Sequence, residues 1–494
     1  MAEDSWLTYP IEFKGGLISN LSPLQQGTNA PGSARILRNF EPSIEGGYRR
    51  ILGYTKYDSA IIPLYGLPVV HGGSQSGTTL IIASMYIIPT VGDTFTITGV
   101  SGTYTIASGG VSYDSSNKRA TLTLVETLAA SPANAAEITF TGTSTIYTPL
   151  GVNVCESYII VAHNADIYKT SGSGYTKINV PSYGTVLVNG GSQTGTTLAL
   201  DGLTSAPQAN DTFKIAGINL IYTVTADATV ASGGSTLAIN PALASSPANN
   251  AVITFLSVSR ASATNTRFDS YDFTGTKKYI IVDGYNPPAT YDGTTFTVLD
   301  DAPADVLGSS LVRLHKNALF FAKGRLLTFT APYTDTDFSP ATGGGVIDVS
   351  DNITGLITFR QQLFIFTETK IFNLTGTSIA DFQLQPVTTD MGCTETDSIQ
   401  EIGTDVIFLS PDGLRLLGAT DRVNDFNFSN ISKVIQSEFS DFKTSSTRVS
   451  SVVIRGKSQY RLFGTSPSYK DENAKGIILT QLAWWYSFSG DARY

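Results

Sequence analysis

The sequence predicts an all-β protein with a β-propeller-like body of six or seven blades, into which two copies of a small β-barrel or β-sandwich module are inserted. Three observations carry this prediction: a duplicated segment, apolar strand patterns that recur along the chain, and a composition typical of short strands and tight turns. Glycine makes up 46 of the 494 residues, aromatic side chains 10% and charged side chains only 15%. Ordinary soluble proteins carry roughly 25% charged residues, so many strands and turns with few charges are expected.

The duplication is clearest in a glycine-rich loop. Residues 72–80 read GGSQSGTTL and residues 190–198 read GGSQTGTTL, an offset of 118 positions. Further matches at nearly the same offset are Asp93–Ile97 with Asp211–Ile215 and Ser131–Asn134 with Ser246–Asn249. Apolar and polar residues alternate within each copy, which is typical of half-buried strands. We therefore expect two inserted β modules, at residues 70–145 and 187–262.

The rest of the chain carries a weaker repeat of apolar strands. Residues 156–162, 166–169 and 175–178 read as three consecutive strands. Similar runs recur, with centres at Ile159, Ile280, Leu319, Phe364, Ile407 and Tyr460. Their spacing is about 40 to 50 residues once a module is removed from the first interval, and such a period with three or four strands per unit is typical of a β-propeller. With N-terminal strands around Tyr48–Leu52, this predicts six or seven blades.

These patterns divide the chain into five parts. They are an N-terminal segment with the first propeller strands (1–69), module 1 (70–145), a blade (146–186), module 2 (187–262) and the remaining blades (263–494). One short helix is predicted near residues 431–442, where apolar side chains recur at steps of three and four, with Asn430 or Ser429 as its N-cap. The alternative is an open string of β-sandwiches, which the even spacing disfavours.

Charge and composition exclude several classes of protein. The net charge is −9 and no basic tract appears, so tight binding of nucleic acid is not expected. No apolar run approaches the roughly 20 residues of a membrane helix, and the start of the chain is acidic, unlike a signal peptide. We therefore expect no membrane segment and synthesis in a cytoplasm. Cys155 and Cys393 are expected to be unpaired buried thiols.

The usual catalytic patterns are weak or absent. His71, His163 and His315 lack the spacing of a metal pair and are expected to be structural or surface residues. Ser115 and Lys118, taken with Ser350–Asn352, resemble the serine β-lactamase motifs, but the third motif is missing.

Acidic residues near predicted strand ends raise two further possibilities, a glycosidase pair or a calcium site. The glycosidase candidates are Asp335, Asp337, Asp348, Asp351 and Asp381, and the calcium candidate is the stretch from Asp335 to Asp351. The stretch lacks the spacing of a calcium loop. A glycosidase usually needs aromatic platforms around its carboxylate pair, and of the three tryptophans in the chain two are adjacent, Trp484 and Trp485. No catalytic, cofactor-binding or metal-binding residues are therefore predicted, and the protein is not expected to be an enzyme.

Several segments resemble one family. The N-terminal segments are Gly15–Leu24, Pro31–Ala34, Arg38–Phe40, Gly46–Arg50 and Gly53–Tyr54, and the later ones are Val312–Phe321, Asp337–Phe338, Ile347–Gly355, Met391–Cys393, Phe408–Arg415 and Ser432–Gln436. Together they resemble the tail nozzle proteins, or tail tubular proteins B, of short-tailed bacteriophages. The resemblance covers roughly residues 10–60 and 265–440 and leaves out both modules.

The resemblance implies a structural subunit of the virion tail. Six copies are expected to form a ring below the tail adaptor protein, with tail fibres nearby, and to continue the channel through which double-stranded DNA leaves the capsid. An N-terminal strand is a candidate to complete the last blade. Acidic loop residues facing such a channel would repel phosphates and let DNA slide, and the candidates are Asp390, Glu395 and Asp412. The alternative meaning of the acidity is simple solubility.

Two rival functions stay open. One is a receptor-binding or carbohydrate-binding phage tail protein in which the duplicated modules are the binding heads. The other, less favoured, is a propeller that cleaves glycans.

Overall fold

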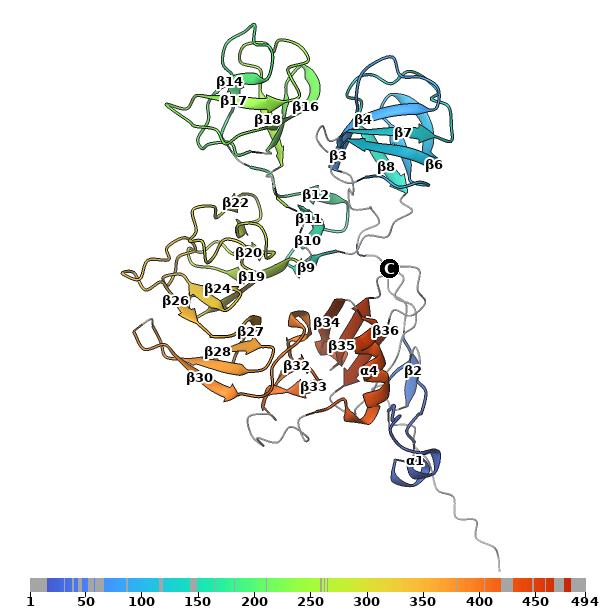
Figure 1. The fold of residues 1–494 in the computed structure, drawn as a ribbon, viewed down its shortest axis with the longest axis vertical. Helices are drawn as coiled ribbons and strands as arrows, with labels where there is room; N and C mark the ends of the chain where they lie inside the picture. The colour runs from blue at the N-terminus through green and yellow to red at the C-terminus, as the bar shows by residue number, and fades with distance from the viewer. Residues whose placement is uncertain are drawn as a thin grey trace, which may run out of the picture. The chain divides into compact units, whose positions relative to one another are not determined.

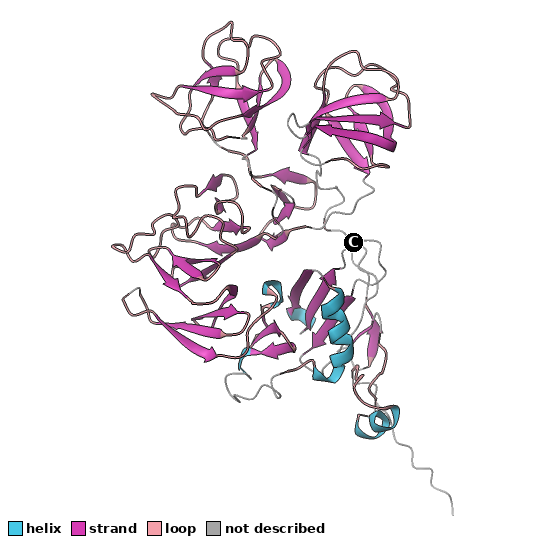
Figure 2. Cartoon of the chain, viewed as in Figure 1, coloured by secondary structure: helices cyan, strands magenta, loops and turns pink. Residues whose placement is uncertain are grey.

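The computed structural model consists almost entirely of short antiparallel strands, with little helix (Figure 1, Figure 2). The chain divides into two compact units, unit 1 (residues 1–56 and 311–494) and unit 2 (residues 57–310). The residues that the structure describes are 16–30, 32–37, 40–42, 47–51, 57, 66–85, 88–114, 119–142, 149–163, 165–181, 183–209, 211–257, 260–261, 263, 265–378, 380–403, 405–418, 430–446, 448–457, 459–465 and 475–480.

Six sheets of the described residues have the form of propeller blades, because their strands are short, antiparallel and adjacent in the order of the sequence. Unit 2 holds β9 (Gly151–Val154), β10 (Ile159–His163), β11 (Asp166–Thr170) and β12 (Tyr175–Lys177), then β19 (Arg267–Tyr271), β20 (Lys278–Val282), β21 (Ala289–Tyr291) and β22 (Phe296–Val298). Unit 1 holds β23 (Leu311–His315), β24 (Ala318–Lys323), β25 (Leu326–Phe329) and β26 (Gly345–Asp348), then β27 (Ile353–Phe359), β28 (Gln362–Thr367), β29 (Ile371–Thr375) and β30 (Gln383–Thr388). Two three-stranded sheets follow, β31 (Gln400–Glu401), β32 (Val406–Ser410) and β33 (Gly413–Leu416), then β34 (Arg448–Ile454), β35 (Gln459–Thr465) and β36 (Lys475–Thr480). The predicted all-β, propeller-like class is confirmed.

All six apolar markers of the sequence lie on the second strand of their sheet. Ile159, Ile280, Leu319, Phe364, Ile407 and Tyr460 are on β10, β20, β24, β28, β32 and β35, respectively. Each repeat in the sequence therefore corresponds to one sheet, and the marker pattern belongs to the same strand each time.

The second strand is buried on both faces, which explains why its apolar run is continuous. In β28, Leu363 and Ile365 pack into a core shared with sheet β23–β26, whereas Phe364 and Phe366 pack into a core shared with β32. Alternate residues of β32 are divided in the same way. One set packs into the core shared with β28, and the other set packs into a third core, which β32 shares with β34, β35 and the C-terminal helix. Because successive side chains of a strand point to opposite faces, one apolar run joins two neighbouring sheets.

Each duplicated segment folds as a nearly closed, six-stranded barrel, which decides between the barrel and the sandwich. Module 1 contains β3 (Gly66–Val70), β4 (Thr79–Met85), β5 (Thr94–Ile97), β6 (Val100–Asp114), β7 (Arg119–Leu124) and β8 (Ile138–Gly142). Module 2 contains β13 (Leu187–Val188), β14 (Thr197–Asp201), β15 (Thr212–Ile215), β16 (Ile218–Val224), β17 (Ser235–Asn240) and β18 (Ile253–Ser257), with the same strand order. Bridges from Val69 to Glu137 and from Leu187 to Val252 connect the first strand to the last. The chain therefore enters and leaves each barrel at one place, as an inserted domain does.

The duplicated unit is larger than the barrel. Module 1 is followed by the four-stranded sheet β9–β12, and module 2 by the four-stranded sheet β19–β22. The two sheets are about as far apart in sequence as the two barrels, and they share one apolar core that includes Ile160, Ile167, Tyr279 and Tyr291. The repeat in unit 2 is therefore one barrel followed by one sheet.

The repeated Gly-Gly-Ser-Gln loop is held by a glutamine clamp. The side-chain amide of Gln75 donates to the carbonyl groups of three residues around the loop, and its oxygen accepts the amide of Ile81 at 2.5 Å. Gln193 makes the same four contacts in module 2, with Ala199 in the place of Ile81. The residues that the two loops have in common are therefore explained by their role in holding the loop.

A buried carboxylate ties the N-terminal hairpin, β1 (Phe40–Pro42) and β2 (Tyr48–Arg50), to the last described sheet. Glu41 is fully buried. Its oxygens lie 2.9 Å from Arg49, 2.9 Å from Lys457 and 2.8 Å from Arg461. Burial alone would raise the pKa of Glu41, but the hydrogen bond and charge of Lys457, a hydrogen bond from Gln459 and the charge of Arg461 hold it below its usual range. In the described residues β1 pairs only with β2, so the hairpin meets the sheet through side chains.

The helices differ from the prediction in two respects. The C-terminal helix, α4, spans Gln436–Ser445 and follows a 3-10 turn at Lys433–Ile435, so it starts later than expected. Ile435 occupies its N-cap position, whereas Asn430 accepts the amide of Ser432 at 3.0 Å. Ser429 lies outside the described residues.

A second helix, α1 (Pro23–Asn29), is missing from the sequence prediction. Its signal is nevertheless local, because Ser22 and Gln25 form a reciprocal capping box and Pro23 stands at the first helical position. Among the described helices, none is long and apolar enough to cross a membrane.

Candidate functional site

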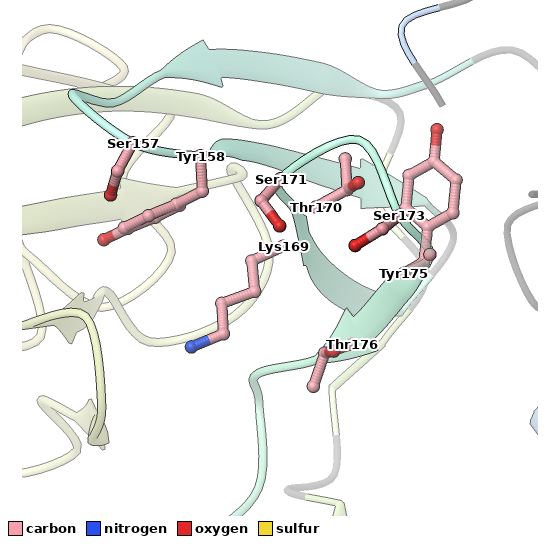
Figure 3. Close-up of a pocket in the computed structure, with 9 residues that line it drawn as sticks. Ser157, Tyr158, Lys169, Thr170, Ser171, Ser173, Tyr175 and Thr176 are labelled. Atoms are coloured by element: carbon pink, nitrogen blue, oxygen red, sulfur yellow. The ribbon is translucent and has the colours of Figure 1, made fainter. Parts of the chain in front are cut away.

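A polar cleft of about 420 Å³ opens on sheet β9–β12 of unit 2 (Figure 3). Its walls come from the start of β10 and from the hairpin that joins β11 to β12. The lining residues include Tyr158, Lys169, Thr170, Ser171, Ser173 and Tyr175. In Figure 3, Lys169 and Tyr158 lie at one end of the cleft and Tyr175 at the other. Hydroxyl groups and a single ammonium group therefore dominate its chemistry.

The turn between β11 and β12 forms one wall because of its alternating Ser-Gly-Ser-Gly sequence. Gly172 and Gly174 adopt φ angles of 99° and 118°, which residues with a side chain rarely tolerate. The Thr170 hydroxyl accepts the amide of Gly172 at 2.9 Å and steadies the turn. The serines that alternate with the glycines, Ser171 and Ser173, are exposed, so their hydroxyls face the solvent that fills the cleft.

Lys169 supplies the only charge among the described residues that line the cleft. Its ammonium group donates to the carbonyl of Gly293 at 3.1 Å. It also lies 5.9 Å from the ring centre of Tyr158 and 5.7 Å from that of Tyr291, within the range of a cation–π interaction. Within the described part of the chain no carboxylate forms an ion pair with Lys169, so its charge is held in place without being neutralised.

Tyr158 is a rigid, neutral hydrogen-bonding group. Its ring meets those of Tyr279 and Tyr291 edge to face, with centroids 6.2 and 6.3 Å apart. Burial raises the pKa of the Tyr158 hydroxyl, and the neighbouring Cys155 raises it further. The phenol therefore stays protonated throughout the physiological range.

This arrangement is suited to binding a polar ligand. General acid–base or nucleophilic catalysis requires a titratable base next to a nucleophile, and the lining residues of the cleft that the structure describes include no His, Cys, Asp or Glu. Sequence reasoning missed the cleft because its residues were interpreted only as strands. The available signal was a lysine before a Ser-Gly-Ser-Gly turn.

The three predicted channel-facing acids lie in two loops of unit 1, with Asp390 and Glu395 in the same connection between β30 and the short 3-10 helix that follows it. Asp390, after β30, is exposed and accepts the hydroxyl of Thr389 at 3.3 Å. Glu395 occupies the N-cap position of a short 3-10 helix, Thr396–Ser398. Asp412, between β32 and β33, makes a two-pronged pair with Arg415 at 3.0 and 2.5 Å.

The charge of Asp412 is therefore balanced locally. Burial alone would raise the pKa of Asp412, but the hydrogen bonds and charge of Arg415 hold it below its usual range. Arg415 itself is almost fully buried, with its side chain 4% exposed. This pair stabilises the turn, which leaves Asp390 as an exposed candidate without an ion pair among the described residues.

The acids weighed as a glycosidase pair or a calcium site instead hold turns together. Asp348 pairs with Arg325 at 3.1 Å, and Asp351 accepts hydroxyl groups of the β28–β29 turn. The backbone amides of Thr377 and Ser378 lower the pKa of Asp381 to about 2, and a backbone amide also lowers that of Asp337. A glycosidase acid needs a raised pKa, so the environments of these two acids oppose that role. Asp335 is half-buried in the loop before Asp337.

The histidines and cysteines are largely buried. His163 is the last residue of β10 and is 2% exposed, as is His315. Burial lowers the pKa of His71 and His163, and burial with a neighbouring lysine lowers that of His315 to about 4. Cys155 and Cys393 are free, buried thiols, as predicted.

Some predicted residues cannot be placed in a site. Ser115, Lys118, Trp484 and Trp485 lie outside the described residues. Ser350 is in a turn after β26, where it has a φ angle of 68° and its amide bonds to Asp348. In the described part of the chain, no group of three or more His, Cys, Asp or Glu side chains is placed to hold a metal ion.

Comparison with known proteins gives structural likenesses only. No protein-family model matches the chain, and no curated protein matches it. A computationally designed protein, Ika8, shares 8% identity over 68% of this chain and 85% of its own, with a TM-score of 0.29. A quinoprotein alcohol dehydrogenase-like protein from Bacteroides thetaiotaomicron shares 10% identity over 86% of this chain and 96% of its own, also at 0.29. The endosialidase of phage phi92 shares 10% identity over 72% and 62%, at 0.22. Likenesses this weak carry no inference about function.

Proposed function

We propose that this protein is a structural, non-enzymatic component of a phage tail, the nozzle ring below the adaptor, acting as conduit and gate for DNA ejection from the virion. The supporting observation is the way the family resemblance is distributed over the fold. The N-terminal stretch and most of the later stretch belong to unit 1, although residues 57–310 separate them in sequence. Buried Glu41 joins the N-terminal stretch to the last described sheet of the same unit, through contacts to residues more than 400 positions away, Lys457 and Arg461. The two barrels, which the resemblance leaves out, are separate insertions in unit 2.

The charge of the chain supports a conduit. Each chain carries a net charge of −9, and six copies around a channel would repel DNA phosphates rather than bind them. Of the three candidate acids, Asp390 is exposed on a loop of unit 1 and bonds to a hydroxyl rather than to a basic side chain, which suits such a lining.

Assembly tests the proposal directly. Purified protein mixed with the tail adaptor protein is expected to form six-fold rings, visible by electron microscopy. A chain that stays monomeric, and that an adaptor ring does not recruit, would contradict it.

A receptor-binding tail protein is the second candidate. The two barrels favour it, because the first and last strands of each barrel lie together and the barrel can therefore be deleted from the chain as a unit. Because β3 begins at Gly66, the deletion that tests it should remove residues 66–142. A receptor-binding role predicts assembled particles that no longer adsorb to the host, whereas the nozzle role predicts normal adsorption. The equivalent deletion of the second barrel removes residues 187–257 and is tested in the same way.

Release of reducing ends from host polysaccharide would instead indicate a glycan-cleaving propeller.

A further inference from the structure

We propose that the cleft on sheet β9–β12 binds an acidic oligosaccharide, with a sugar carboxylate at Lys169, sugar hydroxyls at Ser171 and Ser173, and a sugar ring against Tyr175. Such a site is additional to the ring-forming role and independent of it. Three properties of the cleft lead to this ligand class: an ammonium group without a counter-ion among the residues that the structure describes, a hydroxyl-rich wall, and a lysine that the fold does not require.

The first property concerns the three N–H groups of the Lys169 ammonium. One donates to the carbonyl of Gly293, and the aromatic faces of Tyr158 and Tyr291 attract the charge without accepting it as a carboxylate would. Lys177, on the next strand, is instead paired with Asp166 at 2.6 Å. Lys169 is therefore half-buried, oriented, and able to pair with an anionic group that enters the cleft.

The second property concerns the remaining walls. Exposed serine hydroxyls donate and accept hydrogen bonds, which suits the hydroxyls of a sugar better than a purely anionic ligand such as phosphate. Tyr175, at the far end in Figure 3, offers an aromatic surface for the apolar face of a sugar ring. The volume of about 420 Å³ lies within the usual range of small-ligand sites, about 300 to 1,000 Å³.

The third property comes from the duplicated sheet. Ile160 pairs with Lys169 across β10 and β11, and the equivalent Ile281 pairs with Ala289 across β20 and β21. Ala289 is fully buried and carries no charge. The same sheet therefore folds without a lysine at this position, and packing alone does not explain Lys169.

The test is titration calorimetry on the full-length chain. The probes are a hyaluronan tetrasaccharide, which carries glucuronate carboxylates, cellotetraose as the neutral sugar of equal length, and inorganic phosphate as a competitor. We expect the acidic sugar to bind at least about tenfold more tightly than the neutral one, because a charge-assisted hydrogen bond is worth that much. Lys169→Met, which keeps most of the apolar stem, is expected to remove this preference, and replacing Ser171 and Ser173 together by alanine is expected to weaken binding of both sugars.

Lys323→Met is the control, because Lys323 is exposed, lies outside the cleft and changes the net charge equally; it should bind like the unaltered chain. Equal affinity for both sugars, an unchanged preference in Lys169→Met, or displacement of the sugar by phosphate at equal concentration would each overturn the proposal. Circular dichroism checks that the variants fold. Because the titration needs no ring, its outcome is separate from that of the assembly experiment.

Discussion

Glu41 shows how much one residue can contribute to holding the two ends of unit 1 together. It is fully buried and accepts hydrogen bonds from three basic side chains. Burying a carboxylate is costly unless its partners compensate, and here two of them, Lys457 and Arg461, come from the far end of the chain. Removing the negative charge takes the charge of Glu41 away from Arg461, which is itself 3% exposed.

Glu41→Gln is therefore expected to lower the free energy of unfolding of unit 1 by about 3 kcal/mol, as breaking a buried ion pair does. Urea denaturation followed by circular dichroism measures it. Glu156→Gln is the matched control, because Glu156 pairs with Lys277 on the surface, where it is 83% exposed, and should cost less than about 0.5 kcal/mol. Equal effects of the two substitutions would show that the buried cluster contributes little.

His315 predicts a pH dependence of stability. Burial and the charge of Lys316 lower its pKa from 6.5 to about 4, so the folded state resists protonation more than the unfolded state does. The contribution of neutral His315 to the free energy of unfolding is fully present above pH 6.5. It is lost as the pH falls toward 4, by about 3 kcal/mol in total.

His315→Phe keeps a ring next to Phe320, 5.8 Å away, and removes the titration. Between pH 7 and pH 4 the variant should lose less stability than the unaltered chain, as measured by urea denaturation at each pH. Parallel losses in the two proteins would show that His315 does not contribute.

At the scale of elements, the glutamine clamps explain which residues the two barrels have kept in common. Gln75→Ala removes four hydrogen bonds of the loop and is expected to destabilise module 1 by about 1–3 kcal/mol. The amide of Ile81, which bonds directly to Gln75, should exchange its hydrogen faster. Gln193→Ala should act in the same way on module 2 and leave module 1 unaffected. Gln362→Ala, at an exposed side chain of β28, is the control and should leave exchange in both barrels unchanged.

At the scale of the whole molecule, the structure changes which acidic residue best tests the channel. Reversing the charge of Asp412 would break its pair with buried Arg415, so slow ejection in that variant would be hard to separate from misfolding. Asp390→Lys is the cleaner change and is expected to slow DNA ejection severalfold, because a lysine in the lining attracts phosphates. Particles made with the variant would be measured by the rate of DNA release. Asp305→Lys, an exposed residue of unit 2, is the charge-matched control, and ejection at the same rate in both variants would remove Asp390 from the channel.

Much of the fold was predictable because its signals are local. Ile159, Ile280 and the other markers lie in runs whose period and length depend only on neighbouring residues, and each fell on the same strand of a sheet. The choice between barrel and sandwich was not predictable, because it depends on the pairing of Val69 with Glu137, far apart in sequence. The turn that forms one wall of the cleft has a local signal, but the contacts that orient Lys169 do not, since its partners Gly293 and Tyr291 come from the next sheet.

The sequence by itself determined the all-β class, the duplication and the repeated sheets, because alternating polarity and turn residues encode strands locally. The tertiary structure alone decided which charges are balanced. It pairs Asp412 with Arg415, surrounds Glu41 with three cations, and leaves Lys169 beside a cleft without a described carboxylate partner. The physical reason is that a residue's strand and face depend on its neighbours in the chain, whereas its burial and its counter-ions depend on side chains that only folding brings close.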